Sequence, residues 1–531
     1  MVSRLATETF DVLVVGGGIT GAGVALDAAA RGLRTALVEA EDFASGTSSK
    51  SSKLVHGGIR YLQSGEVRLV YEALRERQRL RRNAPHLVKI LPFLLPILTR
   101  DGLINRRVAR ALGSAMWMYD LTGGWRIGRL HRRVNGDEAH RHMPTMPRDR
   151  LAYGYIYYDA TVDDARLVLT VARTAAAHGA AVANRCRVTA FDHDHEGRVV
   201  GARIDTGDGE IVVTASVVVN AAGVWADEVR TLADGSSTET IRPAKGVHVT
   251  VPWSRLRNDI AAVIPVPGDR RSLFVVPWGR RPEGTFSHTY IGTTDTDYDG
   301  RLGDPPCTST DIGYVLGAVN AAVGTNLTAA DVTGVWAGLR PLVRSANSGR
   351  TADLSRRHRV TTSPTGVVAV TGGKLTTYRE MAEDTVDAVV GALGKRARCR
   401  TKKIALLGAA GFTEIPEGTP EAHLADRYGT LAPAIDELVA KDPRLGDPLV
   451  PGLPYLRAEA VYAAHHEMAT SLADVLVRRT RAHLLDRTAT LAAAPSVAHL
   501  LAEVLGWDAA ERDRQLAAYG DLVARELADA R

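Results

Sequence analysis

The stretch that decides the fold is residues 11–61, DVLVVGGGITGAGVALDAAARGLRTALVEAEDFASGTSSKSSKLVHGGIRY. It opens with the apolar run 12–15, which predicts a buried parallel strand. A glycine-rich turn follows at once, residues 22–30 predict a helix, and the apolar run 35–38 predicts a second strand that ends at Glu39. This order of strand, glycine turn, helix and strand predicts a Rossmann-like unit that binds a dinucleotide.

Each glycine of the turn has its own physical role. Gly16 permits the tight turn, Gly18 lets a pyrophosphate approach the backbone, and Gly21 lets the helix pack closely on the strand. The free amides at the start of the helix then face the phosphates. The residues of this turn that are predicted to bind the cofactor are Gly16, Gly17, Gly18, Ile19, Thr20 and Gly21.

Glu39 ends the second strand, where a carboxylate accepts hydrogen bonds from the adenosine ribose hydroxyls. A carboxylate there also disfavours a 2′-phosphate, which argues against NADP. The alternative is a glycine-rich turn in some other α/β protein. The strand before it, the helix after it and the acid at this distance favour the dinucleotide site.

The continuation separates FAD from NAD. The run 47–61, TSSKSSKLVHGGIRY, is polar, then interrupted by glycines, then basic and aromatic. Its serines compete with helical hydrogen bonding, so a polar segment that lies along a cofactor fits better than a helix. With Leu62, the run resembles the bacterial aerobic, FAD-dependent glycerol-3-phosphate dehydrogenase family, for which TSSxSSKLxHGGxRYL is characteristic.

The resemblance covers nearly the whole chain, and it is looser from about residue 85 to 150 and beyond residue 400. The further matching runs are DDARL at 163–167, NAAG at 220–223, IGTTD at 291–295, GLRPL at 338–342 and GGKLTTYR at 372–379. The resemblance implies additional FAD contacts at Thr47, Ser48, Ser49, Ser52, Lys53, Leu54, Gly57, Gly58, Ala222, Gly223, Gly373, Lys374, Leu375 and Thr376.

The activity that the resemblance implies is the oxidation of sn-glycerol 3-phosphate to dihydroxyacetone phosphate in aerobic glycerol catabolism. A hydride would leave C2 for flavin N5 while a base takes the hydroxyl proton, and the electrons would pass to membrane quinone. A phosphate dianion needs fixed cations, and arginine binds it with two parallel hydrogen bonds. The substrate-binding candidates, carried over by motif, are Arg60, Tyr61, Arg340, Arg356 and Lys374.

Four residues are candidates for the catalytic centre: His56, His248, Arg340 and Lys374. Histidine suits proton abstraction near neutral pH, so His56 and His248 are the candidate bases. A lone histidine is more often structural, and an arginine-bound alkoxide is another route. The sequence leaves this choice open.

The predicted fold class is α/β with α+β character. A Rossmann-like FAD-binding domain is expected in three pieces, residues 1–90, 151–240 and 341–399. Strand patterns at 247–251, 272–277 and 289–293 predict an antiparallel-sheet substrate domain at 241–340. Residues 91–150 are expected to form a basic helical insertion or part of the substrate domain. Residues 400–531 are expected to form an α-helical C-terminal domain without catalytic chemistry.

The composition excludes several classes of protein. With 45% hydrophobic and 24% charged residues, the chain is an ordinary globular one. Its three cysteines, Cys186, Cys307 and Cys399, match no metal spacing, so a reducing compartment and no metal are expected. The first ten residues lack an apolar signal region, and no run reaches the roughly 18 unbroken apolar residues of a spanning helix. These features predict a cytoplasmic protein.

The formal charge of +6 permits nucleic acid, anionic lipid or an anionic substrate as a partner. No nucleic-acid motif is present, so no nucleic-acid partner is expected. The basic, amphipathic stretch from Arg75 to Arg133 can lie on an anionic membrane surface. The resemblance to a family that passes electrons to membrane quinone favours such peripheral contact for the region as a whole, on the inner face of the plasma membrane. An internal helix pair with a solvated face is the alternative. A homodimer is also expected.

Three other functions remain to be weighed. A glycerol-3-phosphate oxidase, with oxygen as the acceptor, shares the motifs. A flavin-dependent RNA-modifying protein is permitted by the basic charge but lacks an RNA-binding module. A non-catalytic flavin-binding scaffold would leave Arg60, Arg340 and Lys374 without a common purpose.

Overall fold

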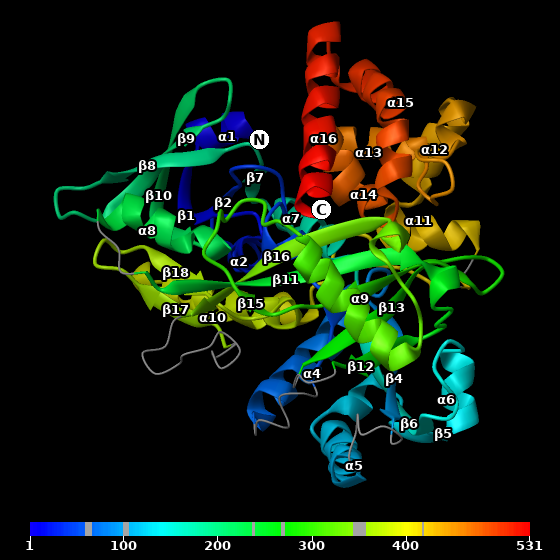
Figure 1. The fold of residues 1–531 in the computed structure, drawn as a ribbon. Coiled ribbons are helices and arrows are strands. Elements are labelled where there is room, and N and C mark those ends of the chain that lie inside the picture. Colours follow the sequence, from blue (N-terminus) through cyan, green and yellow to red (C-terminus); the bar gives the residue numbers. More distant parts are fainter. Residues whose placement is uncertain (59–65, 99–105, 236–238, 267–270, 344–356, 417–418) are drawn as a thin grey trace.

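The structure is a computed structural model that describes residues 1–58, 66–98, 106–235, 239–266, 271–343, 357–416 and 419–531. Within these residues the strands form two sheets, and a group of C-terminal helices, orange to red in Figure 1, lies beside them. The candidate substrate residues Arg60, Tyr61 and Arg356 lie outside the described residues.

The first sheet has the strand order β17-β18-β10-β1-β2-β7, with β9 paired to β10 and β8 to β9. Strands β18, β10, β1, β2 and β7 run parallel, whereas β8, β9 and β17 pair antiparallel with their neighbours. The bounds are β1 Thr9–Val15, β2 Thr35–Val38, β7 Ala181–Ala183, β8 Arg187–His193, β9 Val199–Asp205, β10 Glu210–Asn220, β17 Arg359–Thr362 and β18 Val368–Thr371.

Helix α2 (Ile19–Ala30) packs between α7 (Asp164–Ala177) and α10 (Tyr378–Ala392) on one face of this sheet. Its alanines and glycines let these neighbours approach closely, since a side chain at Gly23 would meet the Tyr378 ring at 2.8 Å. Helices α1 (Val2–Thr7) and α8 (Ala226–Asp234) cover the other face. The Rossmann-like unit expected from the sequence is therefore confirmed.

The second sheet has the strand order β15-β11-β14-β13-β12-β4-β6-β3, with β16 paired to β11 and β5 to β6. Its pairs are antiparallel apart from β12 and β4, which run parallel. The bounds are β3 Leu54–Val55, β4 Lys89–Leu98, β5 Arg132–Asn135, β6 Leu151–Thr161, β11 Ile241–Pro252, β12 Ala261–Pro265, β13 Ser272–Arg280, β14 Phe286–Gly292, β15 Thr296–Asp297 and β16 Gly334–Val343.

The second sheet takes in chain that the sequence analysis assigned elsewhere. Strand β4 overlaps the start of residues 91–150, for which a basic helical insertion or part of the substrate domain was expected. It is not helical because Pro92 and Pro96 cannot sit in a helix interior. Helices α4 (Val67–Asn83), α5 (Arg106–Leu121) and α6 (Gly136–His142) accompany it. Strand β6, expected in the second FAD-binding piece, pairs with β4 along its whole length and so belongs to the second sheet.

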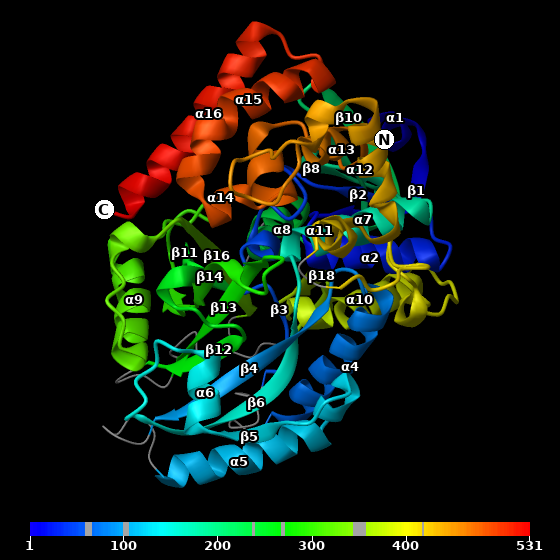
Figure 2. The same ribbon diagram turned by 90° about the vertical axis from the view of Figure 1, so that its right-hand side faces the viewer.

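Helix α9 (Ser309–Val323) covers the second sheet, whereas the remaining helices form the C-terminal domain with a core of their own. In Figure 2 this domain lies at the opposite end of the molecule from α5. Its helices are α11 Pro420–Tyr428, α12 Pro433–Lys441, α13 Arg457–His466, α14 Ala482–Leu485, α15 Arg487–Leu505 and α16 Ala509–Asp529.

Helix α15 is not an unbroken apolar run, since Arg487, Pro495 and Glu503 interrupt it. Among the described residues it is nevertheless long enough and, by mean hydropathy, apolar enough to cross a membrane. It packs against α13 and α16 and contributes Val497 and Leu501 to the C-terminal core. Its apolar character is thus the character of a core helix.

Candidate active site

A cleft with a volume of about 1820 Å³ lies between the first sheet, the second sheet and the C-terminal helices. Strands β1, β10 and β18 are parallel neighbours, so the turns that follow them meet at one edge of the sheet, where open α/β sheets bind ligands. The predicted cofactor residues that line the cleft are Gly16, Gly18, Ile19, Thr20, Glu39, Thr47, Ser48, Ser49, Ala222, Gly223, Gly373, Lys374 and Leu375.

The glycines of the first turn are required for different reasons. A side chain at Gly21 would meet the Gly16 carbonyl oxygen at 1.8 Å, and one at Gly16 would meet the Ala221 carbonyl oxygen at 2.7 Å. The packing of the chain itself therefore excludes side chains there. A side chain at Gly18 would meet only the flexible Ser48 side chain, at 3.1 Å, and nothing else among the described residues within 4 Å. The open space in front of Gly18 fits the approach of a ligand.

The amides at the start of α2 have polar partners in the cleft wall. The Ile19 amide donates to Ser48 Oγ at 3.0 Å, and the Gly17 amide donates to Glu39 Oε2 at 2.6 Å. The segment that carries Ser48 thus reaches the N-terminus of α2, where the helix dipole favours an anion.

The Glu39 carboxyl also accepts a hydrogen bond from the Glu41 amide, at 2.9 Å. Burial raises the pKa of Glu39, although the amide hydrogen bonds of Glu41 and Gly17 act against the shift. The nearby Asp42 and Glu41 charges add to the rise. Its place at the end of β2, on the cleft wall, fits a contact with the adenosine ribose.

The polar segment 47–53 joins the two sheets. Small residues of the second sheet make room for it, since a side chain at Gly338 would meet the Lys50 carbonyl oxygen at 2.6 Å. Three hydrogen bonds tie it to β16 and β14: Thr47 Oγ1 to the Leu339 carbonyl (2.6 Å), Trp336 Nε1 to the Ser51 carbonyl (3.1 Å) and Tyr290 Oη to the Ser52 carbonyl (2.9 Å).

His248 lies opposite this segment on β11. Its Nε2 is 2.9 Å from Ser52 Oγ, and its ring stacks on Trp336, its cross-strand partner, with ring centres 4.8 Å apart. Burial, together with the Lys53 and Arg340 charges, lowers the pKa of His248 well below its ordinary value. The imidazole is therefore neutral at pH 7, and the same shift makes it a weaker base than an exposed histidine.

Arg340 lies on the same face of the second sheet as His248 and Trp336, because alternate residues of a strand share a face. Its guanidinium donates to Thr293 Oγ1 and the Thr294 carbonyl at 3.1 Å each, and it pairs with Asp295 at 3.2 Å. The half-buried cation is thus held in one orientation.

His56 and the turn after β18 meet on the other side of the segment. The His56 amide donates to Thr376 Oγ1 at 3.2 Å, and the His56 ring lies edge-on to Phe274 with centres 6.3 Å apart. Phe274 and His248 are both partners of Gly292 across neighbouring strands. Both candidate bases therefore lie near one row of the second sheet.

Other predicted cofactor residues do not line the cleft: Gly17, Gly21, Ser52, Lys53, Leu54, Gly57, Gly58 and Thr376. Lys53 Nζ instead lies 3.3 Å from Asp164 and 4.3 Å from the centre of the Trp336 ring. Burial, with the charge of Arg481, lowers the pKa of Lys53 to about 8, although Asp164 opposes the shift. Lys53 is thus part of the support behind the cleft.

Sequence analysis missed Trp336 and the basic run around Arg478 and Arg481, both of which line the cleft. Trp336 offered no signal, because its role depends on cross-strand register. The basic run could have been noticed in the sequence, since three arginines in four positions follow the apolar Val477.

Comparison with known proteins adds the following. The sequence model described as FAD dependent oxidoreductase matches residues 11–382, and the one described as C-terminal domain of alpha-glycerophosphate oxidase matches residues 399–512. Glycerol-3-phosphate dehydrogenase 2 of Mycobacterium tuberculosis is 44% identical, and glycerol-3-phosphate dehydrogenase of Mycobacterium leprae is 43% identical, each over 99% of this chain and 90% of the relative. The structure of the glycerol-3-phosphate dehydrogenase from Bacillus halodurans complexed with FAD matches with a TM-score of 0.78 and 31% identity, over 100% of this chain and 96% of that one.

Replacing Gly18 with Val is expected to give a folded but colourless protein. The side chain would displace Ser48 in the protein but would block the pyrophosphate. We expect FAD affinity at least about tenfold lower, which is ~1.4 kcal/mol, measured by flavin absorbance after dialysis. Gly317→Val is the matched control, because a side chain there meets nothing within 4 Å in the described residues. Full FAD occupancy in Gly18→Val would contradict this placement of the pyrophosphate.

Proposed function

The chain belongs to the family of FAD-dependent glycerol-3-phosphate dehydrogenases, and on this premise we propose that it oxidises sn-glycerol 3-phosphate to dihydroxyacetone phosphate and passes the electrons to membrane quinone. The observation that carries the proposal is the face of the second sheet opposite the cofactor segment. It carries an oriented cation, Arg340, and a neutral imidazole, His248. Neither side chain lines the cleft itself, but Trp336, the cross-strand partner of His248, and Pro341, the chain neighbour of Arg340, do. A phosphate and an alcohol need these two groups.

The cleft fits FAD, as the open space before Gly18 indicates. The amides at the start of α2 would hold the pyrophosphate, Glu39 the ribose, and residues 47–51 the middle of the cofactor. When bound, FAD supplies the acceptor for the hydride from C2 of the substrate. The chain's own residues position the alcohol and handle its proton.

Arg340 would bind the phosphate with Arg60, Tyr61, Arg356 and Lys374, which are proposed from the resemblance. The contacts with Thr293, Thr294 and Asp295 hold its guanidinium in place before substrate arrives, so little entropy is lost when the phosphate binds. A cation held in this way also selects the phosphorylated substrate over glycerol.

His248 would take the C2 hydroxyl proton. Its low pKa keeps the ring neutral, and Ser52 and Trp336 fix its orientation. His56 is the competing base, and an alkoxide bound by arginine remains the third route. Substitution of each histidine distinguishes them.

The electron acceptor is the finer part of the proposal. The match of residues 399–512 to a domain named for alpha-glycerophosphate oxidase favours oxygen as a second candidate. The test is reduction of a quinone or dye with glycerol 3-phosphate beside glycerol and lactate. Hydrogen peroxide in stoichiometric yield would favour the oxidase, and no turnover of glycerol 3-phosphate with any acceptor would overturn both.

A peripheral position on the inner face of the plasma membrane is part of the same proposal. The region at and after the end of α5 exposes large apolar side chains, which are Trp117, Met118, Leu121, Trp125 and Leu130. Basic residues follow at Arg126, Arg129, Arg132 and Arg133. Apolar side chains with a basic rim suit an anionic bilayer interface. The homodimer stays a prediction, which light scattering measures.

Arg340→Ala is expected to lower kcat/KM for glycerol 3-phosphate by on the order of 2–4 kcal/mol, because the charge partner of the phosphate is lost. Arg340→Lys keeps the charge without the planar donor pair and should lose less. Glycerol is the control, since the native enzyme should use it poorly and the substitution should change that little. Equal losses on both substrates would mean that Arg340 does not bind the phosphate, and FAD content would then separate a folding defect from a defect in hydride transfer.

His248→Asn is expected to lower kcat by on the order of 10²–10⁴-fold, because asparagine keeps the hydrogen bond to Ser52 but accepts no proton. In the native enzyme the lowered pKa keeps the base unprotonated to acidic pH, so the acid limb of the kcat/KM profile should lie below about pH 6.5. His56→Asn is the matched variant. A large loss there, with near-native His248→Asn, would assign the base to His56.

Serine at Trp117, Leu121 and Trp125 together is expected to reduce sedimentation with anionic vesicles several-fold, because the apolar anchor is removed. Binding of the native protein should fall with salt, since each basic residue contributes roughly 1 kcal/mol that salt screens. Leu527→Ser changes an exposed leucine on α16 and is the control. Equal sedimentation of the native protein with neutral and anionic vesicles would contradict the proposal.

A further inference from the structure

Three arginines of the C-terminal domain reach the FAD-binding domain through its buried interior. Arg478 and Arg479 end the π-helical turn Asp474–Arg479, and Arg481 precedes α14 in a left-handed backbone conformation (φ +65°). Arg479 and Arg481 are buried, with 2% and 1% of their surface exposed. Buried arginines need anionic partners. Arg478 and Arg479 have Asp474 and Glu467 within their own domain, but the carboxylate that they share, Asp42, and the carboxylate that binds Arg481, Asp164, lie across the domain boundary.

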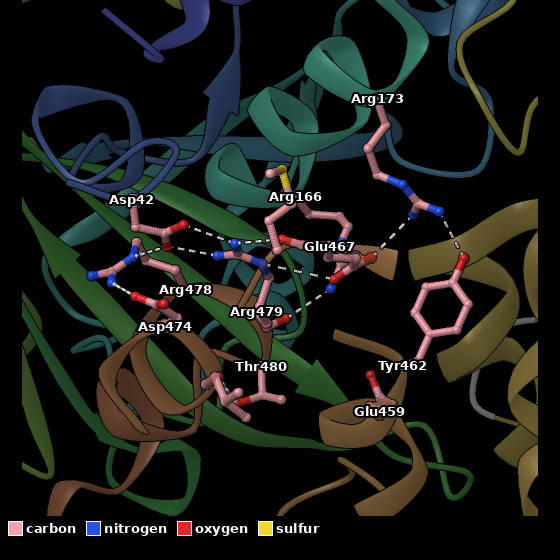
Figure 3. A network of polar contacts seen from close by, with 12 residues as sticks. Asp42, Arg166, Arg173, Glu459, Tyr462, Glu467, Asp474, Arg478, Arg479 and Thr480 are labelled. Carbon is pink, nitrogen blue, oxygen red and sulfur yellow. Dashed lines mark hydrogen bonds and ion pairs between the residues drawn. The ribbon is translucent and has the colours of Figure 1, made fainter. Parts of the chain in front are cut away.

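Asp42 is the first of these partners, as Figure 3 shows. Arg479 donates to both of its carboxylate oxygens, at 2.7 and 2.8 Å, and Arg478 Nε binds the same carboxylate. Burial would raise the pKa of Asp42, but the charges of Arg479 and Arg478 outweigh it and hold the pKa well below its usual value. The Asp42 carboxylate is therefore ionised, and the two arginines bind it to the C-terminal domain.

Asp164, at the start of α7, is the second partner. Arg481 Nη2 contacts the Asp164 carboxylate and donates to the Ser49 carbonyl at 2.7 Å. Asp164 in turn accepts hydrogen bonds from the Ser51 amide at 3.0 Å and the Ser51 hydroxyl at 2.7 Å. Lys53 joins the same group through Ser49 and Asp164. This arrangement fixes the backbone of residues 49–53.

The segment between Asp42 and residues 49–53, which Asp164 holds, is a wall of the cofactor cleft. Residues 44–51 line it continuously, and Ser48 accepts the Ile19 amide at the start of α2. The Asp42 carbonyl accepts the Ser45 amide and so closes a turn, and within that turn the Ala44 amide donates to the Gly17 carbonyl, which ties the segment to the glycine turn. The positions of Asp42 and Asp164 therefore determine the shape of the wall.

The same part of the C-terminal domain contacts the other wall. The Arg487 amide donates to the Thr333 carbonyl at 2.9 Å, just before β16 begins. A side chain at Gly334 would meet the Leu484 carbonyl oxygen at 2.1 Å, so α14 packs directly on the backbone of β16. Residues 478–487 thus touch both the cofactor segment and the strand that carries Trp336 and Arg340.

We propose that Arg479 and Arg481 are positioning residues, which act through Asp42 and Asp164 to hold residues 43–51 in the conformation that retains FAD. The C-terminal domain is then a part of the cofactor site. Without Arg479, a buried carboxylate would lose its two-pronged partner and the segment would move to solvate it. This inference rests on FAD dependence and is independent of the substrate and of the electron acceptor.

The experiment compares FAD release from the purified holoenzymes of Arg479→Gln, Arg481→Gln and Arg173→Gln. Arg173 is the matched control, since it joins α7 to the C-terminal domain through Glu467 (3.2 Å) and Tyr462 Oη (2.9 Å), as Figure 3 shows. Its hydrogen bonds and ion pairs among the described residues include none with residues 42–53. The readouts are the rate at which free flavin fluorescence appears on dilution, the visible absorption spectrum of bound flavin, and the melting temperature.

We expect Arg479→Gln and Arg481→Gln to release FAD at least about tenfold faster than the native protein and to alter the flavin band. Arg173→Gln should stay within about twofold even where its melting temperature falls. Arg481→Lys should be intermediate, because it keeps the charge but cannot bind Ser49 and Asp164 with the same geometry. Where a Gln variant fails to fold, Arg479→Lys and Arg481→Lys decide by the same rate. Native release rates and spectra in the folded variants, with only the melting temperature lowered, would overturn the proposal. A failed glycerol 3-phosphate assay would not affect it.

Discussion

The close contact of the turns that follow β1, β10 and β18 is the constraint on which the site depends. Parallel pairing brings their carboxyl ends to one edge of the first sheet. There a side chain at Gly16 would collide with the Ala221 carbonyl oxygen, and a side chain at Gly21 would collide with the Gly16 carbonyl oxygen. Chain from three distant parts of the sequence must therefore converge before any cofactor wall exists, which is why the FAD-binding domain is discontinuous.

The second requirement is a cover for the polar segment 47–53. Its carbonyl groups need donors, and an apolar surface would leave them unsatisfied. The second sheet provides Trp336 Nε1 and Tyr290 Oη, and the C-terminal domain provides Arg481. Because these donors come from different domains, the segment holds all three parts of the molecule together. The same packing brings His248 beside Ser52.

The Rossmann-like unit and the helical C-terminal domain could be predicted from the sequence because glycine spacing and apolar periodicity are local patterns. FAD could be predicted because the run 47–61 resembles that of an FAD-dependent family. Local patterns did not predict the pairing of β4 with β6 or the stack of His248 on Trp336, since strand register depends on distant partners. The arginines of residues 478–481 were missed because a basic run in a sequence does not show whether it is exposed. Arg479 and Arg481 are buried against Asp42 and Asp164, acidic partners that lie more than three hundred residues earlier in the chain.

An arginine-rich boundary explains why the C-terminal domain can be both separate and part of the site. A larger apolar interface would hold the C-terminal domain on the FAD-binding domain but would specify its orientation weakly. Buried charges specify it strongly, because any other orientation would leave a buried charge without its partner. Arg479 reaches both oxygens of Asp42, and Arg481 reaches a carbonyl and a carboxylate at once. Each pairing can form in only one orientation of the C-terminal domain relative to the FAD-binding domain. The orientation that satisfies them is also the orientation that closes the cofactor wall.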